Sequence, residues 1–178
     1  LKMSKKIMIV YKSVTGFTKE YAQMIAQELD CSLIDFKNVT AQMMSEADIV
    51  IFGSRMHAGM VDGLKKAKQL FAQSKASQFI VFATGAMPNE EKDTIDEMWK
   101  NNFTSEELQQ IPHFYMQGGL RYKKMPFFDK MMMKVFCMMM KKKKNKNEKE
   151  QQLADIITMS YDISSKSYIM PLIEFLKL

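Results

Sequence analysis

The sequence predicts an α/β fold of three layers, in which helices cover both faces of a doubly wound sheet of five parallel strands in the order 2-1-3-4-5. Two observations predict it: five short apolar runs, and segments of helical periodicity between them. A strand of a parallel sheet is apolar throughout, because both of its faces are covered. The expected strands are residues 6–11, 31–35, 48–54, 78–84 and 113–117.

Helices are predicted between these strands and at the end of the chain. Apolar side chains recur with helical spacing in residues 19–29, and residues 62–74 have one apolar face. Thr104 and Glu107 have the spacing of a capping box, which predicts a helix start. The remaining expected helices are residues 40–46, with Thr40 as N-cap, residues 89–101 and residues 167–178.

Length and composition indicate one globular domain, expected at residues 3–178. The chain has 178 residues, of which 47% are hydrophobic and 26% charged, values typical of folded domains. Cys31 and Cys137 are the two cysteines, too few for a disulfide scaffold, and no secretory signal is evident. A cytoplasmic location is therefore expected. His57 and His113 lack metal-ligand spacing, so no metal site is predicted.

The net charge of +6 is concentrated in one segment after the fifth strand. Residues 121–149 hold eleven basic and two acidic residues, a net charge of +9, which leaves −3 for the rest of the chain. Seven of the nineteen methionines lie there as well. We expect a helical insert at about residues 120–160. Nucleic acid is a poor candidate partner, since Lys141–Lys144 has no interleaved aromatic residues and arginine is nearly absent.

The loop between the first strand and the first helix carries the most specific chemical signal. Ser13, Thr15 and Thr18 surround Gly16 at a strand-to-helix junction, where backbone N–H groups and the helix dipole favour a phosphate. The sequence has neither a GxxxxGK[ST] nor a GxGxxG motif, so nucleoside triphosphates and nicotinamide dinucleotides are not predicted. The phosphate of a flavin mononucleotide (FMN) fits this loop. The alternative is that Ser13 and Thr15 only cap the helix.

Four segments resemble flavodoxin-domain proteins. SVTGFT (13–18) resembles the phosphate loop of flavodoxins, and GSRMHAG (53–59) resembles a second loop of the same family. GGLRY (118–122) and FFDKMMMKVFCMMM (127–140) resemble the insert of flavodoxin-type, menaquinone-dependent protoporphyrinogen oxidases, which ordinary short-chain flavodoxins lack. The resemblance implies a flavodoxin-like fold, FMN as cofactor and a redox activity that belongs to the cofactor, with no catalytic side chain.

The resemblance also implies the residues that bind FMN. Residues 13–18 would hold the phosphate, residues 54–59 and 84–87 would flank the isoalloxazine ring, and Ala58 and Gly59 would lie at its N5 edge. His57 replaces the usual loop aromatic, so the ring could stack on His57, Met56 or Met87, while His57 could equally be an exposed loop residue. The implied residues are Ser13, Val14, Thr15, Gly16, Phe17, Thr18, Ser54, Arg55, Met56, His57, Ala58, Gly59, Thr84, Gly85, Ala86 and Met87.

The insert and the activity leave alternatives open. As a helix, the insert would expose a broad apolar arc that packs on the domain, on a second subunit or on an anionic membrane surface. In the third case residues 123–149 would contact the lipid, and the protein would be peripheral at the inner face of the membrane. The first functional hypothesis is an oxidoreductase like the protoporphyrinogen oxidases, taking electrons from a planar hydrophobic substrate such as a porphyrinogen and passing them to a quinone. The alternative is a non-enzymatic electron carrier that docks on redox partner proteins.

Overall fold

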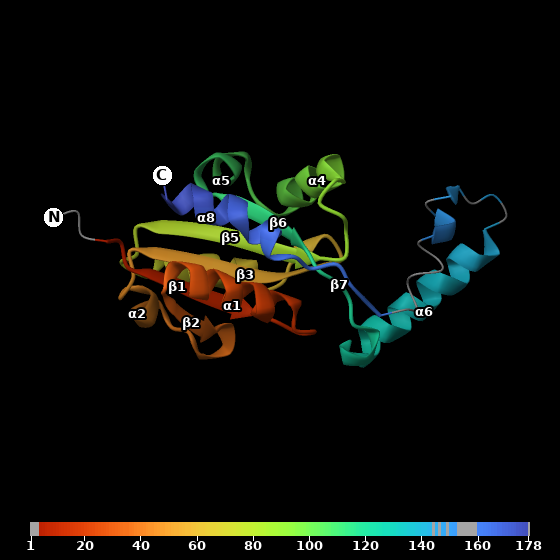
Figure 1. The fold of residues 1–178 in the computed structure, drawn as a ribbon, viewed down its shortest axis with the longest axis horizontal. Coiled ribbons are helices and arrows are strands. Elements are labelled where there is room, and N and C mark those ends of the chain that lie inside the picture. Colours follow the sequence, from red (N-terminus) through yellow and green to blue (C-terminus); the bar gives the residue numbers. More distant parts are fainter. Residues whose placement is uncertain (1–3, 144, 146, 149, 153–159, 178) are drawn as a thin grey trace. The chain divides into compact units, whose positions relative to one another are not determined.

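Five parallel strands in the order β2-β1-β3-β5-β6 form the main sheet of the computed structural model (Figure 1). This order confirms the predicted order 2-1-3-4-5, because β5 and β6 are the fourth and fifth parallel strands. The structure describes residues 4–143, 145, 147–148, 150–152 and 160–177. The strands are β1 (Ile7–Lys12), β2 (Ser32–Asp35), β3 (Ile49–His57), β5 (Gln78–Gly85) and β6 (His113–Gln117), with the short β4 (Met60–Val61) paired antiparallel to β3.

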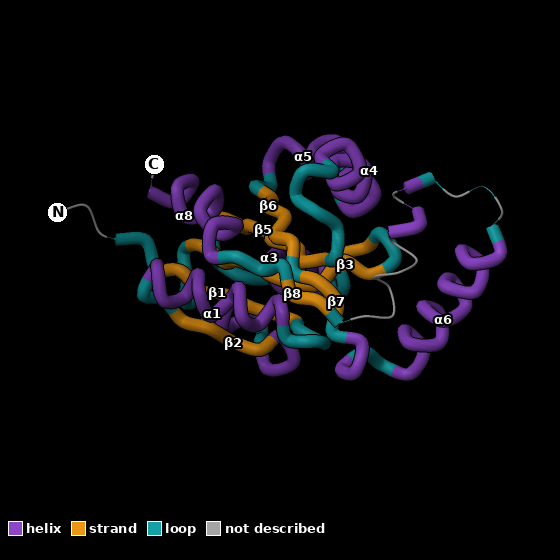
Figure 2. Tube along the Cα trace, turned by 45° about the vertical axis from the view of Figure 1, so that its right-hand side comes forward, coloured by secondary structure: helices purple, strands orange, loops and turns teal. Residues whose placement is uncertain are grey.

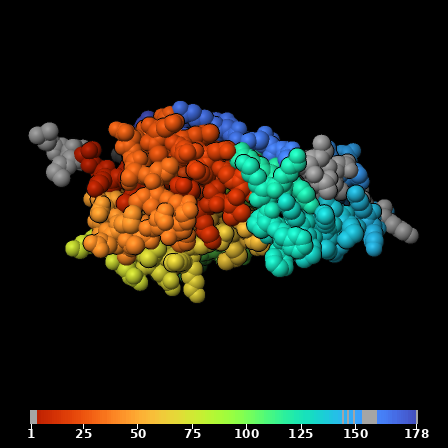
Figure 3. Space-filling model, turned by 90° about the horizontal axis from the view of Figure 1, so that it is seen from below, coloured from red at the N-terminus to blue at the C-terminus, as the bar shows by residue number. Residues whose placement is uncertain are grey.

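Helices cover both faces of this sheet, as the continuous apolar strands predict (Figure 2). Helices α1 (Phe17–Leu29) and α8 (Met170–Lys177) pack on one face and contact each other, and the space-filling view shows the blue C-terminal segment bordering the red and orange α1 (Figure 3). The opposite face carries α2 (Ala41–Met44), α3 (Leu64–Ala72), α4 (Lys92–Asn102) and α5 (Ser105–Gln110).

Side chains of alternate residues in each strand point into two separate hydrophobic cores. In the central strand β3, Ile49 and Ile51 point into the α1/α8 core, whereas Val50 and Phe52 point into the core beneath α3 and α4. All four side chains are buried, as are the register partners of Val50, Ile51 and Phe52 on β1 and β5. The period of two in a pleated strand explains why an unbroken apolar run was the right signal for these strands.

Local capping signals also agree with the structure. Thr104 and Glu107 form the predicted capping box: the Glu107 N–H donates to Thr104 Oγ1 at 3.1 Å, and the Thr104 N–H donates to Glu107 Oε2 at 2.9 Å. Thr40 caps α2 by accepting from the Met43 N–H at 3.2 Å. The expected closing helix at residues 167–178 is divided, because a 3₁₀ turn (Lys166–Ile169) precedes α8.

The chain separates into two compact units, residues 1–118 with 164–178 and residues 119–163. The second unit corresponds to the predicted insert, of which residues 144, 146, 149 and 153–159 lie outside the described residues. It contains the antiparallel pair β7 (Gly119–Leu120) and β8 (Tyr161–Asp162), a 3₁₀ turn (Tyr122–Lys124) and the 16-residue helix α6 (Phe127–Lys142).

One buried tyrosine joins the two points at which the chain leaves and re-enters the first unit. The Tyr21 hydroxyl donates to the Gln117 carbonyl oxygen at 2.5 Å and accepts from the Ser165 N–H at 3.1 Å. Tyr21 is 1% exposed. Tyr21 of α1 therefore holds both ends of the insertion point within the first unit.

Candidate functional site

The loop after β1 has the backbone conformation that a glycine-containing anion loop requires. Gly16 is the N-cap residue of α1 and has φ 106°, in the left-handed region that residues with a Cβ atom rarely adopt. The Glu20 N–H donates to the Gly16 carbonyl oxygen at 3.0 Å, which begins the helix immediately after the turn. The first-turn N–H groups of a helix have no intrahelical acceptors and carry the positive end of its dipole, so the loop is suited to an anion.

Thr18 and Thr84, two of the predicted site residues, are in direct contact. Their hydroxyl oxygens lie 2.8 Å apart in a hydrogen bond, and the two residues are 1% and 2% exposed. Thr18 lies in the first turn of α1 and Thr84 near the end of β5, so this bond joins the first predicted loop to the third. The Phe17 side chain is buried and packs on Gly118, where a Cβ atom would come within 2.9 Å of the ring, so Phe17 could contact a phosphate only through its backbone.

Two serine hydroxyls of the predicted site are buried without a protein partner. Ser13 Oγ and Ser54 Oγ have no hydrogen-bond partner among the described residues. Ser13 directly follows Lys12, and Lys12 is the register partner of Ser54 on the neighbouring strand. Both serines therefore lie at the carboxyl edge of adjacent strands. A buried hydroxyl without a partner costs about 1–3 kcal/mol, which a bound acceptor or donor at this edge would recover.

The second predicted loop is not a loop, which corrects the expected end of the third strand at residue 54. Strand β3 continues through Ser54, Arg55, Met56 and His57, then turns through Ala58 and Gly59 into β4. Ala58 has φ 49° and Gly59 φ 78°, the positive values at both central positions that a type I′ hairpin turn needs. The predicted N5-edge residues are thus the tip of a rigid hairpin.

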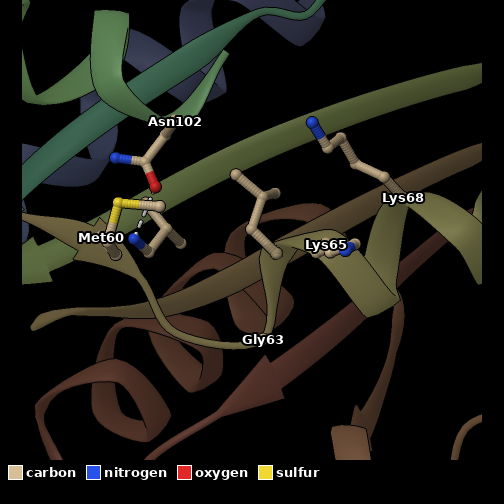
Figure 4. A pocket seen from close by; sticks show the side chains of 7 residues that line it. Met60, Gly63, Lys65, Lys68 and Asn102 are labelled. Atoms are coloured by element: carbon tan, nitrogen blue, oxygen red, sulfur yellow. Dashed lines mark hydrogen bonds between the residues drawn. The ribbon is translucent and has the colours of Figure 1, made fainter.

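Asn102, at the end of α4, holds this hairpin and was not predicted. Its Nδ2 donates to the Gly59 carbonyl oxygen at 2.9 Å and to the Met98 carbonyl oxygen at 2.7 Å. Its Oδ1 accepts from the Val61 N–H at 2.7 Å, the bond drawn as a dashed line in Figure 4. The side-chain amide therefore ties the hairpin tip to the helix beneath it. No local sequence signal marks this role, because it depends on where the end of α4 lies in space.

The third predicted loop is braced by β6. The Tyr115 hydroxyl donates to the Met87 carbonyl oxygen at 2.9 Å. Asn89 and Gln117 bond reciprocally: the Asn89 N–H donates to Gln117 Oε1 at 2.7 Å, and the Gln117 N–H donates to Asn89 Oδ1 at 2.9 Å. These contacts hold the backbone around Ala86 and Met87 at the carboxyl edge of the sheet, and Asn89 and Gln117 are further residues that sequence reasoning missed.

Asp62 forms ion pairs with two basic side chains beside the hairpin. Lys12 Nζ donates to Asp62 Oδ1 at 2.7 Å, and Arg55 Nε lies 3.6 Å from Asp62 Oδ2. Arg55 is thereby held against the protein, with 21% of its side chain exposed, rather than extended into solvent. The cluster carries one net positive charge at the carboxyl edge of the sheet, a sign that suits an anionic cofactor.

The candidates for stacking on an isoalloxazine ring differ in their surroundings. Met56 and Met87 pack against the core beneath α3 and α4, and Met56 Sδ lies 3.9 Å from Asn102 Nδ2. His57, by contrast, stands opposite Met60 in the hairpin, where Met60 is 52% exposed. Met56, His57 and Met87 are all half-buried, so each stays a candidate for stacking on the ring.

Other chemistries find little support in the described part of the chain. No cluster of three or more histidine, cysteine or acidic residues suited to a metal occurs among the described residues. Burial, with a smaller contribution from the Asp30 charge, raises the pKa of the Cys31 thiol to about 11, so this thiol stays protonated at neutral pH. A hollow of about 170 Å³ beside the hairpin, lined by Met60, Lys68 and Asn102 (Figure 4), is smaller than the ~300–1,000 Å³ usual for cofactor sites.

Comparison with known proteins decides the family. The family model described as "Flavodoxin domain" matches residues 8–148. The chain belongs to the flavodoxin-domain family. This confirms the broader resemblance recognised in the sequence, while the narrower resemblance to protoporphyrinogen oxidases is not established by the match. A search of curated proteins found no match.

Several solved structures are similar to this flavodoxin domain. A flavodoxin from the domain Archaea is 17% identical, with 97% of this chain and 99% of that chain covered and a TM-score of 0.42. Flavodoxin 1 from Bacillus cereus is 14% identical, with coverages of 85% and 96% and a TM-score of 0.42. A flavoprotein from Lactobacillus acidophilus, solved in complex with FMN, is 15% identical, with coverages of 64% and 92% and a TM-score of 0.40.

FMN is the cofactor of this flavodoxin domain, and the residues at the carboxyl edge of the sheet fit it. The hydroxyls of Ser13 and Ser54 are buried and have no hydrogen-bond partner in the described part of the chain, so they can bind a cofactor oxygen or nitrogen without breaking a described contact. Gly16 gives the loop the shape in which backbone N–H groups face an anion. The hairpin tip and the braced backbone of Ala86 and Met87 would flank the ring.

Proposed function

We propose that this flavodoxin-domain protein is an FMN-dependent oxidoreductase that takes electrons from a planar hydrophobic substrate and passes them to a quinone-type acceptor. The observation that carries the proposal is that one chain combines an FMN fold with a helix, α6, whose large apolar side chains are exposed. A lipid-soluble quinone or a porphyrin-like substrate partitions to apolar surfaces. The resemblance of residues 118–140 to the insert of protoporphyrinogen oxidases makes a porphyrinogen the first donor to test.

The protein's own part in this reaction is to bind and position. FMN, when bound, supplies the electron-transfer chemistry. The loop at Ser13–Thr18 would hold its phosphate, and Ser54 would donate to or accept from the ring or its side chain. Asn102 keeps the Ala58–Gly59 turn fixed through the Gly59 carbonyl oxygen, so the backbone that would face the ring is already ordered before FMN binds.

An electron carrier without its own substrate is the second candidate. The family description, "Flavodoxin domain", supports it, because electron-carrier flavodoxins have such a domain. A carrier would exchange electrons with partner proteins and would not need the insert. The two candidates therefore differ in what the second unit contributes.

The experiment is anaerobic reduction of the FMN-loaded protein followed by reoxidation with menaquinone and ubiquinone analogues, with free FMN as the reference. The proposal expects reoxidation by a quinone faster than that of free FMN, and loss of this advantage when residues 123–149 are deleted. Protoporphyrinogen is then supplied as donor to the oxidised protein. Equal quinone reoxidation of the intact and deleted proteins, with unchanged reduction by a flavodoxin reductase, would contradict the oxidoreductase and support the carrier.

A further inference from the structure

Helix α6 of the second unit exposes an unusual concentration of large apolar side chains. Of the twelve exposed large hydrophobic residues among the described residues, eight belong to this one helix. Phe127 and Phe128, at its start, are 74% and 71% exposed. The other six are Met131, Met132, Val135, Phe136, Met138 and Met139. Single exposed apolar side chains are ordinary, but a continuous group of this size marks a binding surface.

The exposed side chains lie on one half of the helix. At about 100° per residue, the eight positions span an arc of roughly 180°. Asp129 and Cys137, eight residues apart, are buried on the opposite side, where Met133 and Met140 are half-buried. One side of helix α6 is therefore already buried. The apolar arc is a second side of the same helix, and its side chains are exposed.

Lysines border the uncovered arc and extend beyond both ends of the helix. Lys134 and Lys141 are exposed and follow one flank, because they are seven residues apart. Lys123 and Lys124 precede the helix, and Lys142 lies at its end. The acidic residue of the helix, Asp129, is buried on the other side. The surface that the arc presents is thus apolar with a positive border.

The base of the helix is held by contacts within its own unit. Lys130 Nζ donates to the Lys123 carbonyl oxygen at 3.1 Å and lies 5.7 Å from the centre of the Tyr122 ring. Arg121 Nη2 pairs with Asp162 Oδ2 at 3.0 Å across the β7–β8 ribbon. These cations are engaged within the unit, whereas Lys134 and Lys141 are on the flank of the apolar arc.

A second copy of the chain fits this surface poorly. Two copies that met through the apolar arc would bring the lysine borders of both helices together, and like charges brought close destabilise a contact. An anionic lipid surface has the opposite sign, and each basic residue near such a surface adds to the attraction. Charge complementarity therefore favours lipid over self-association.

The helix is suited to lie in a membrane interface rather than to cross a membrane. Its 16 residues span about 24 Å, less than the ~30 Å of a hydrocarbon core. Within the described ranges, no helix is long and apolar enough to span a bilayer. A one-sided apolar helix with basic residues at its border is the pattern of helices that bind in the plane of the interface.

We propose that α6 docks the protein on anionic membranes, with Phe127 and Phe128 inserted among the acyl chains and Lys134 and Lys141 at the headgroups. The docking rests on the helix alone and needs no electron transfer. It would bring the flavodoxin domain to the surface in which lipid-soluble redox partners are dissolved.

The test is flotation of the full chain, loaded with FMN, with phosphatidylcholine vesicles that contain phosphatidylglycerol and with pure phosphatidylcholine vesicles. We expect binding to the anionic vesicles that weakens as salt rises, because the Debye length falls from about 10 Å at 0.1 M to about 3 Å at 1 M. Equal binding to the two kinds of vesicle, or no binding to either, would overturn the proposal.

Paired substitutions separate the two parts of the surface. Lys134→Glu with Lys141→Glu should lower the vesicle partition coefficient at least ~25-fold, since each basic residue near an anionic surface is worth about fivefold. The matched control, Lys75→Glu with Lys92→Glu, changes two exposed lysines of the first unit and should retain far more binding. A control pair that lowers binding as much as the α6 pair would assign the attraction to net charge and overturn the proposal.

Phe127→Ser with Phe128→Ser tests insertion of the apolar side chains. Each phenylalanine that leaves water is worth roughly tenfold or more in partition, so this pair should abolish flotation at high salt and weaken it at low salt. Flavin absorbance and circular dichroism of every variant verify that the fold is intact. Sedimentation velocity completes the design, because a wild-type dimer that this pair converts to a monomer, without vesicle binding by the wild type, would assign the surface to a second copy.

Discussion

The hydroxyls of Thr18 and Thr84 form a hydrogen bond of 2.8 Å that joins the first turn of α1 to the end of β5. Both residues are almost fully buried, at 1% and 2% exposure. The two segments are 66 residues apart in sequence, and both belong to the region that fits FMN. The bond therefore fixes the loop between β1 and α1 relative to the loop that follows β5 in the absence of a cofactor.

Removing one hydroxyl of this pair should destabilise the protein more than removing both. Thr18→Val leaves the Thr84 hydroxyl buried without its partner, which costs about 1–3 kcal/mol. Thr84→Val leaves Thr18 in the same position. In the double variant neither hydroxyl is buried without its partner, so its free energy of unfolding should lie above that of either single variant. Urea unfolding of the flavin-free proteins measures all four, and strictly additive losses would contradict the coupling.

Gly16→Ala should weaken FMN binding and destabilise the fold. Gly16 has φ 106°, and an alanine there is strained by about 1–2 kcal/mol or must move the loop away from its present shape. Titration of the flavin-free protein with FMN, followed by the quenching of flavin fluorescence, measures the affinity, and urea unfolding measures the stability. Lys19→Ala, an exposed change in the same first turn, is the control and should leave both quantities near wild type.

Asn102→Ala should loosen the hairpin that carries Ala58 and Gly59. The substitution removes the donor to the Gly59 carbonyl oxygen and the acceptor of the Val61 N–H, so we expect a loss of about 1–3 kcal/mol in the free energy of unfolding. Because the hairpin tip would lie at the flavin edge, the midpoint potential of bound FMN should shift as well. Asn101→Ala alters the exposed neighbour on the same helix and is the matched control. An unchanged midpoint potential of bound FMN in Asn102→Ala would contradict a position of the hairpin tip at the flavin edge.

The sheet and its order could be predicted because the signal is local and strong. Each parallel strand is covered on both faces, so its sequence is apolar without interruption, and five such runs separated by helices leave few arrangements. Thr104 and Glu107 show the same principle on a smaller scale, since both partners of the capping box lie within four residues. The fold class and these caps follow from residues that are close in sequence, and the strand order follows from the few arrangements that such a fold allows.

The contacts that shape the candidate site are not local, and for this reason they were missed. Asn102 reaches the Gly59 carbonyl oxygen across 43 residues of sequence, and Asn89 exchanges hydrogen bonds with Gln117 across 28. Residues 54–57 were expected in a loop because they follow the apolar run of residues 48–54 and resemble a flavodoxin loop, yet pairing with β4 extends the strand to His57. That pairing depends on the turn at Ala58. Ala58 has a positive φ, which is uncommon for a residue other than glycine, so the turn is hard to predict from the sequence.

Acid should weaken the contact between α5 and α3 through Glu107. Lys68 Nζ donates to both Glu107 carboxylate oxygens, at 2.8 and 3.0 Å. The hydrogen bond from Lys68 lowers the pKa of Glu107 most; partial burial opposes this effect, and the Thr104 N–H and the Lys68 charge add to it. Because the folded pKa lies below the unfolded pKa, the stabilisation is complete above the unfolded pKa and is lost as pH falls through the folded value.

Glu107→Gln removes this pH-dependent part while keeping an acceptor for the Thr104 N–H. The difference in the free energy of unfolding between wild type and Glu107→Gln, measured in urea, should be present at pH 7 and shrink toward zero as the pH falls below the ordinary range of a glutamate. Glu106→Gln changes an exposed carboxylate of the same first turn and controls for the helix dipole. If this difference in the free energy of unfolding stayed constant from neutral to acid pH, the charge of Glu107 in its pair with Lys68 would contribute nothing to stability.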